Sequence, residues 1–201
     1  MKTLFFNHLK TYHVYYCFNF GVFIGGILLG FYYISFQSPE NVSILSQSIL
    51  DIFQGTTIQN MANISQHIIQ SLIVISIIYA LSLSVIALPI LPIILFYKSM
   101  QLGFTAALYL ITFETKGIVG IIFTLIPYIF FEFIAYFTSF AISYELSLSI
   151  LITSFIKKQT LNYKEVFSHI FNSIIWTLCF LMASVLTQIY VLPFIFKIFI
   201  S

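Results

Sequence analysis

The stretch from Ile86 to Phe113, IALPILPIILFYKSMQLGFTAALYLITF, is apolar along almost its whole length and carries one charged residue, Lys98. An apolar run of this length is typical of a transmembrane helix. The rest of the chain follows the same pattern, since 60% of its 201 residues are hydrophobic and only 7% are charged. A soluble domain carries roughly a quarter of charged residues. The sequence therefore predicts an integral membrane protein.

Five apolar segments of about membrane length predict an all-α, polytopic fold in which residues 1–201 form one helical membrane domain. The first segment is longer than a signal-peptide core, and no small-residue cleavage site follows it, so we expect it to be retained. An outer loop at 37–67 and a cytoplasmic segment at 143–169 connect the spans. The expected spans are about 14–36, 68–88, 93–113, 118–142 and 170–192.

Lysines orient the predicted spans, because cytoplasmic loops of membrane proteins are enriched in basic residues. Lys2 and Lys10 precede the first span, and the segment between the fourth and fifth spans contains three more lysines. The outer loop contains no lysine or arginine. We therefore expect the N-terminus in the cytoplasm and the C-terminus outside. The net charge of +2 is small and gives no indication of nucleic-acid binding.

Two prolines, Pro89 and Pro92, raise the question of where the second span ends and the third begins. Proline disfavours helix at the residue before it. A break at residues 88–92 leaves two helices of membrane length, whereas a break at Lys98 leaves a third span of roughly 22 Å against a core of roughly 30 Å. We favour the break at the prolines. The alternative is a kinked, continuous second helix followed by a short third span.

Lys98 and Glu132 are expected to lie inside the membrane. With a break at the prolines, Lys98 sits roughly 8 Å from the inner end of the third span, and Glu132 is the only acid in the middle of a span. The short loop at Glu114–Gly117 makes the third and fourth spans antiparallel neighbours, so the two side chains fall at similar depth. Since an ionised carboxylate alone in lipid is costly, we hypothesise a Lys98–Glu132 pair.

This pair has more than one possible role. It can lock helix packing, or it can form a site for a partner helix, a lipid head group or an ion. Lys98 can also extend to the membrane interface without a partner. A proton relay usually needs several ionisable groups, and the middle of the spans offers one carboxylate.

Four glycines of the first span, in GVFIGGILLG, recur at intervals of four residues: Gly21 and Gly25, and Gly26 and Gly30. Small residues at this spacing allow helix backbones in membranes to approach closely. The pattern predicts tight packing, either within this chain or against the membrane anchor of a partner.

The outer loop is expected to contain an amphipathic helix that begins at Ser38. Ser38 suits the N-cap, Pro39 the first helical position and Glu40 the first turn. Such a helix can rest on lipid or on the bundle, or offer a docking surface to extracytoplasmic proteins. Its apolar face is predicted to consist of Val42, Leu45, Ile49, Ile52 and Phe53.

A second amphipathic helix is expected on the cytoplasmic side, after the fourth span. Lys157 and Lys158 fall on its polar side, which would place them near anionic head groups. We therefore interpret it as an interfacial helix. Its apolar face is predicted to consist of Leu148, Leu151, Ile152, Phe155 and Ile156.

The sequence lacks the motifs of common enzyme sites, including HExxH, GxSxG and the P-loop. Its four histidines are scattered near span ends, which is unlike a metal site. Cys17 and Cys179 lie far apart in apolar segments without a CxxC motif, so we expect neither a disulfide nor a metal ligand. The sequence predicts a protein without catalytic residues, metal or cofactor.

Three proline-containing segments carry a family resemblance. In PYIFFEFIA, Pro127, Glu132 and Ala135 match a pattern of Pro-His-Gly, two residues, then Glu, any residue, Pro and Ala. Near the end, SVLTQIYVLP matches a second pattern at Pro193, with Gln188 in place of an acid. The central SVIALPILPIILFYKSMQLGF is similar to a third. Through these segments the chain resembles the stage II sporulation protein M family of endospore-forming bacteria, over nearly its whole length.

The resemblance implies a role in engulfment during sporulation, in the cytoplasmic membrane at the septum. Proteins of this family are understood to anchor a machine that degrades the cell wall. The implied partners, besides membrane lipid, are a lytic transglycosylase and an amidase/endopeptidase, which would perform the chemistry. The leading expectation is thus a non-catalytic scaffold for peptidoglycan hydrolases. The alternative is a membrane subunit of a transport permease or exporter, with Lys98 and Glu132 lining a path.

Overall fold

The computed structural model describes residues 2–54, 57–153 and 163–191. Within these ranges the chain forms seven α-helices and no strand, which confirms the all-α, polytopic membrane class. A 3-10 turn at Ile34–Phe36 follows the first helix, and π-helical turns occupy Ile121–Leu125 and Thr187–Val191. The helices are α1 (Lys2–Tyr33), α2 (Pro39–Gln54), α3 (Thr57–Ser82), α4 (Ala87–Phe113), α5 (Thr115–Gly120), α6 (Ile126–Leu151) and α7 (Tyr163–Leu186).

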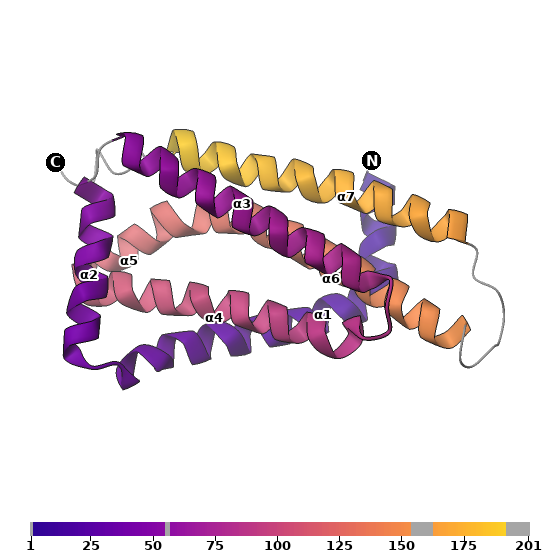
Figure 1. Cartoon of the computed structure of the whole chain (residues 1–201), viewed down its shortest axis with the longest axis horizontal. Coiled ribbons are helices and arrows are strands. Elements are labelled where there is room, and N and C mark those ends of the chain that lie inside the picture. The colour runs from indigo at the N-terminus through magenta and orange to yellow at the C-terminus, as the bar shows by residue number, and fades with distance from the viewer. Residues whose placement is uncertain (1, 55–56, 154–162, 192–201) are drawn as a thin grey trace.

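Helices α3, α4, α6 and α7 and the greater part of α1 run along one common direction, while the first turns of α1 and the whole of α2 lie across it (Figure 1). Helices α3, α4, α6 and α7 contribute the main buried cluster, and α1 packs against it through half-buried side chains such as Tyr16 and Phe23. The cluster consists mostly of aromatic and branched aliphatic residues. Its largest fully buried members are Phe140, Ile78, Leu91 and Leu95.

Within the described residues, three helical segments are long and apolar enough to cross a membrane: His13–Phe36, Ala87–Phe113 and Ile129–Leu151. The apolar parts of α3 and α7 are shorter, at Ile68–Ser82 and Ile170–Leu186. The chain is therefore a membrane-embedded helical protein. The count of five spans and the orientation in the membrane stay predictions.

The break between α3 and α4 lies before the two prolines, at residues 83–86, so the predicted break at residues 88–92 is wrong. Pro89 is the third residue of α4, where backbone N–H groups have no partner within the helix in any case. Pro92 lies inside α4. The prolines therefore accompany the start of a helix and do not separate two, and α4 begins six residues earlier than the predicted third span.

Helix α6 supports this break through two hydrogen bonds. Because Pro92 has no N–H, the carbonyl of Leu88, four residues earlier, loses its helical partner. The Tyr144 hydroxyl donates to this carbonyl at 2.8 Å. One turn further along α6, the Ser147 hydroxyl donates to the carbonyl of Ser84 at 2.7 Å. These bonds satisfy backbone carbonyls at the turn between α3 and α4, where the hydrogen-bonding pattern of the helices is incomplete.

We expect Tyr144→Phe to lower the free energy of unfolding by about 1 kcal/mol, because it leaves the Leu88 carbonyl without a donor. In a Pro92→Ala background the restored N–H can bond that carbonyl, so the same substitution should cost less than half as much. Unfolding in mixed micelles, followed by circular dichroism, measures both values. Tyr97→Phe is the control, since Tyr97 is 60% exposed. An equal cost in both backgrounds would contradict this role for Tyr144.

Helix α6 also continues further than predicted. The fourth span was expected to end at residue 142, yet α6 runs to Leu151 without interruption. Ser143, Leu146 and Ser147 are buried in the bundle. The predicted interfacial helix is therefore wrong in its first part, because residues 148–151 belong to α6. The second part of that prediction, residues 154–158 with Lys157 and Lys158, lies outside the described residues.

The amphipathic helix predicted to begin at Ser38 is confirmed as α2, whereas its place on the outer side stays a prediction. The backbone N–H of Asn41 donates to the Ser38 hydroxyl at 3.4 Å, so Ser38 serves as the N-cap. Three of the predicted apolar residues, Val42, Leu45 and Ile49, pack with Phe104 of α4 around a small cluster of Ile34 from the 3-10 turn and Ala107 and Leu108 from α4. The side chains of Ile52 and Phe53 lie outside the described part. Helix α2 thus rests on the bundle.

Candidate intramembrane site

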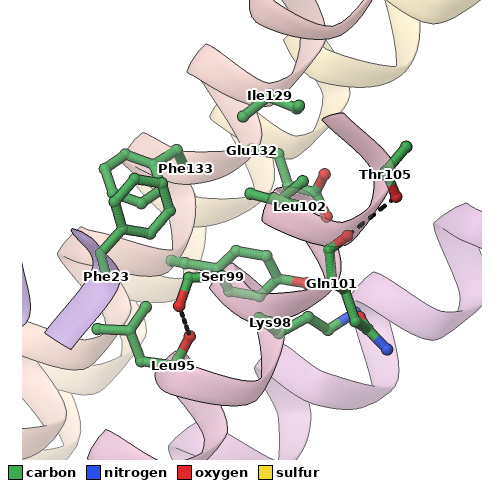
Figure 2. Close-up of a pocket in the computed structure, with 11 residues that line it drawn as sticks. Phe23, Leu95, Lys98, Ser99, Gln101, Leu102, Thr105, Ile129, Glu132 and Phe133 are labelled. Carbon is green, nitrogen blue, oxygen red and sulfur yellow. Dashed lines mark hydrogen bonds between the residues drawn. The ribbon is translucent and has the colours of Figure 1, made fainter. Parts of the chain in front are cut away.

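A cavity of about 180 Å³ lies between α1, α4 and α6. Figure 2 shows its two sides, with Phe23 and Phe133 facing each other on one side and the nitrogen ends of Lys98 and Gln101 on the other. Lys98 and Glu132, which the sequence places at similar depth, both contribute to its wall. The lining residues are Phe23, Leu95, Lys98, Ser99, Gln101, Leu102, Thr105, Ile129, Glu132, Phe133 and Tyr136.

Glu132 is the buried acid of this cavity, with 8% of its surface exposed. The Ser71 hydroxyl of α3 donates to its Oε1 atom at 2.8 Å. A carboxylate at this depth needs such donors, because there is no water to replace them. The π-helical turn at Ile121–Leu125 directly precedes Pro127, whose missing N–H favours such an irregularity. It changes the rotation of the helix just before the turn that carries Glu132.

Lys98 lies nearer the middle of its helix than the sequence predicted. Since α4 begins at Ala87 and not near Ile93, Lys98 is roughly 16 Å from the start of a helix that is roughly 40 Å long. Its ammonium lies 6.0 Å from the ring centroid of Tyr136, at the outer limit of a cation–π contact. A direct ion pair between Lys98 and Glu132 stays a prediction.

The opposite wall of the cavity is aromatic. The ring centroids of Phe23 and Phe133 are 3.8 Å apart, and those of Phe133 and Phe137 are 4.0 Å apart. Aromatic rings at these distances pack with a large contact area. These rings connect α1 to α6. The polar wall on α4 therefore determines what the cavity can bind.

Close approach of α1 and α4 brings Phe23 to the cavity. A Cβ atom added at Gly26 would overlap the Ser99 hydroxyl, and one at Gly30 would overlap the carbonyl of Met100. Gly103 of α4 lies equally close to the backbone of α1. Gly26 and Gly30 are thus used for packing within this chain. Gly25 has an ordinary 3.8 Å contact with Phe96, and Gly21 has open space around it. Packing of these two glycines against a partner stays a prediction.

Among the polar residues of this site, sequence reasoning missed Ser71, Ser99, Gln101, Thr105 and Tyr136. Lys98, Gln101 and Thr105 recur at i, i+3 and i+7 on α4, which is the spacing of one helical face. This polar stripe was visible in the sequence within an otherwise apolar run. The contribution of Ser71 and Tyr136 was not visible, because it depends on how α3 packs against α6.

A second polar group lies deeper in the bundle, where α3, α6 and α7 meet. The Tyr79 hydroxyl is 2.6 Å from the Ser173 hydroxyl and 2.8 Å from that of Thr177, which is 3.0 Å from that of Ser139. All four residues are buried. Interhelical hydrogen bonds of this kind hold membrane helices together, so we assign this group to packing.

Neither metal chemistry nor a disulfide finds support in the described ranges. No three His, Cys, Asp or Glu side chains come together there as a metal site would require. Cys17 and Cys179 are free and exposed. Of the family-pattern residues, Glu132 lines the cavity and Ala135 is fully buried in α6, whereas Pro193 lies outside the described residues.

Comparison with protein families tests the resemblance. A family model described as stage II sporulation protein M matches residues 19–193. The chain belongs to this family. The match extends from the middle of α1 to just beyond the last π-helical turn, so every wall of the cavity belongs to the stage II sporulation protein M region. Comparison with curated proteins and with solved structures found no match. Family membership establishes a sporulation-related membrane protein.

Proposed function

We propose that the chain is a non-catalytic membrane scaffold that anchors and organises peptidoglycan hydrolases at the septum during engulfment. The observation that carries this proposal is the stage II sporulation protein M match over residues 19–193. The implied partners are a lytic transglycosylase and an amidase/endopeptidase. Their chemistry takes place outside the cytoplasm, so the scaffold needs a surface at the outer end of its bundle.

Helix α2 offers such a surface. Its packing on α4 and on Ile34 of the 3-10 turn fixes it across one end of the bundle (Figure 1). Among its described side chains, two large apolar ones are exposed, Ile44 at 60% and Leu50 at 37%. An exposed apolar residue beside polar ones, on an element held in place, is a suitable contact for a partner protein.

Affinity purification tests this proposal. The tagged chain is isolated from membranes of sporulating cells, and co-purifying proteins are identified by mass spectrometry. We expect both hydrolases to be recovered, and we expect Ile44→Asp to reduce their recovery at least tenfold. Ser48→Asp is the matched control, since it adds the same charge to a polar, exposed position of α2. Recovery of a cytoplasmic ATPase without hydrolases would instead support the permease subunit and overturn the scaffold.

A further inference from the structure

The polar stripe on α4 is the feature that the proposed function leaves unexplained. Lys98, Gln101 and Thr105 occupy one face near the middle of a segment long and apolar enough to span the membrane. Gln101 is exposed, and its amide hydrogen-bonds to none of the described residues. Polar side chains at this depth normally face protein or water. A polar surface that faces outward at this depth needs another molecule to cover it.

The cavity beside the stripe limits what that cover can be. Its volume of about 180 Å³ is close to that of a cavity known to hold a benzene-sized group. Pockets for drug-sized molecules start at roughly 300 Å³. The space therefore suits one side chain, not a sugar or a whole lipid head group.

Depth narrows the choice further. Lys98 lies roughly 16 Å from the start of α4, whereas lipid head groups lie outside a hydrocarbon core of roughly 30 Å. What surrounds the site at mid-depth is acyl chains or another membrane helix. Only a helix brings a polar group to this depth with its own backbone already hydrogen-bonded.

Charge determines the kind of side chain. Lys98 supplies hydrogen-bond donors, and Glu132 supplies acceptors on the facing helix. An acidic side chain entering the cavity would be repelled by Glu132, and a basic one would be repelled by Lys98. A neutral group that both donates and accepts satisfies the two at once. The carboxamide of Asn or Gln does this best, because its N–H₂ can bond Glu132 while its carbonyl accepts from Lys98.

We propose that the cavity on α4 is a lateral docking site for a transmembrane helix of another protein, which inserts one carboxamide side chain between Lys98 and Glu132. Gln101 lies at the edge of the cavity and adds a second polar contact to the incoming helix. Phe23 and Phe133 close the far side. This docking site goes beyond the scaffold proposal, because it requires neither a hydrolase nor the outer surface of the bundle.

Reconstitution of the full chain in phosphatidylglycerol–phosphatidylethanolamine vesicles tests the proposal. The probes are leucine-based transmembrane peptides with a central Asn, Leu, Asp or Lys. Energy transfer from a dye on the peptide to dyes on the exposed Cys17 and Cys179 gives apparent dissociation constants. We expect the Asn peptide to bind about 10-fold more tightly than the Leu peptide, as one or two interhelical hydrogen bonds provide. The Asp and Lys peptides should bind more weakly than the Asn peptide.

Variants of the chain distinguish this site from other surfaces. Lys98→Met and Leu102→Phe should both abolish the preference for Asn, the first by removing the donor and the second by filling the space. Lys116→Met is the matched control, because Lys116 is exposed in α5 and lies outside the cavity.

Photolabelling locates the bound peptide. A diazirine placed beside the Asn of the peptide should label α4. Equal binding of the Asn and Leu peptides, a preference that survives in Lys98→Met, or labelling of α7 in its place would overturn the proposal. If the original chain self-associates and Lys98→Met abolishes this self-association, the proposal is overturned as well, because the occupant would then be a second copy of the chain.

Discussion

Glu132→Gln is expected to lower the free energy of unfolding of the isolated chain by about 2 to 3 kcal/mol, the range found when one partner of a buried charged interaction is lost. The Gln carbonyl can still accept the Ser71 hydrogen bond. The loss therefore reports the missing charge and not a broken contact with α3. Unfolding in mixed micelles at several ratios of detergent measures the change.

The double variant tests the Lys98–Glu132 pair directly. If the two charges stabilise each other across the cavity, Lys98→Met should cost much less in a Glu132→Gln background than in the original chain. We expect a coupling energy of at least about 1 kcal/mol. Glu40→Gln is the control, because Glu40 is exposed in α2 and should change stability by less than about 0.5 kcal/mol. If the effects of the two substitutions are additive, Lys98 and Glu132 do not stabilise each other in this fold.

The features that sequence reasoning predicted correctly depend on local properties of the chain. The length of the apolar runs indicates a helical membrane protein, and Ser38 followed by Pro39 and Glu40 indicates the start of α2. The chain turns at Glu114, inside the connection predicted at Glu114–Gly117, and this turn places α4 beside α5 and α6. That connection was sufficient to predict that Lys98 and Glu132 lie at similar depth, and the structure places both on one cavity.

The errors arise where a local signal has two meanings. Proline ends one helix or begins another, and here Pro89 belongs to the first turn of α4, so the break falls before it. The apolar spacing from Leu148 to Ile156 suggested a separate interfacial helix. Its first part instead continues α6, which packs inside the bundle, where Ser147 donates to the carbonyl of Ser84. Tertiary packing decides both cases, and it leaves no trace in the local pattern.

The polar stripe on α4 shows a different limit. The helical spacing of Lys98, Gln101 and Thr105 is evident in the sequence. Spacing alone does not say whether such a face points into the bundle or away from it. The structure supplies the missing facts, since Gln101 is exposed and a cavity lies beside it. The two experiments on this site are therefore complementary. The double variant measures the charges in the isolated chain, and the peptides measure what the same charges do when a second helix is present.

Gly30→Ala is expected to have one of the largest effects of a single methyl group added to the described residues. The new Cβ would overlap the backbone carbonyl of Met100, and a backbone atom cannot turn away as a side chain can. Helices α1 and α4 must then separate, which withdraws Phe23 from the cavity wall. Overpacking of this kind costs typically 1–3 kcal/mol and occasionally more. We place Gly30→Ala at about 3 kcal/mol.

Gly21→Ala is the matched control for this prediction. It adds the same methyl group to the same helix, at a position with no heavy atom within 4 Å. Alanine favours helix over glycine, so stability should be unchanged or slightly higher. Unfolding of the two variants in mixed micelles gives the difference. Equal stability of the two would mean that α1 and α4 are not in direct backbone contact, and it would remove the reason for Phe23 to line the cavity.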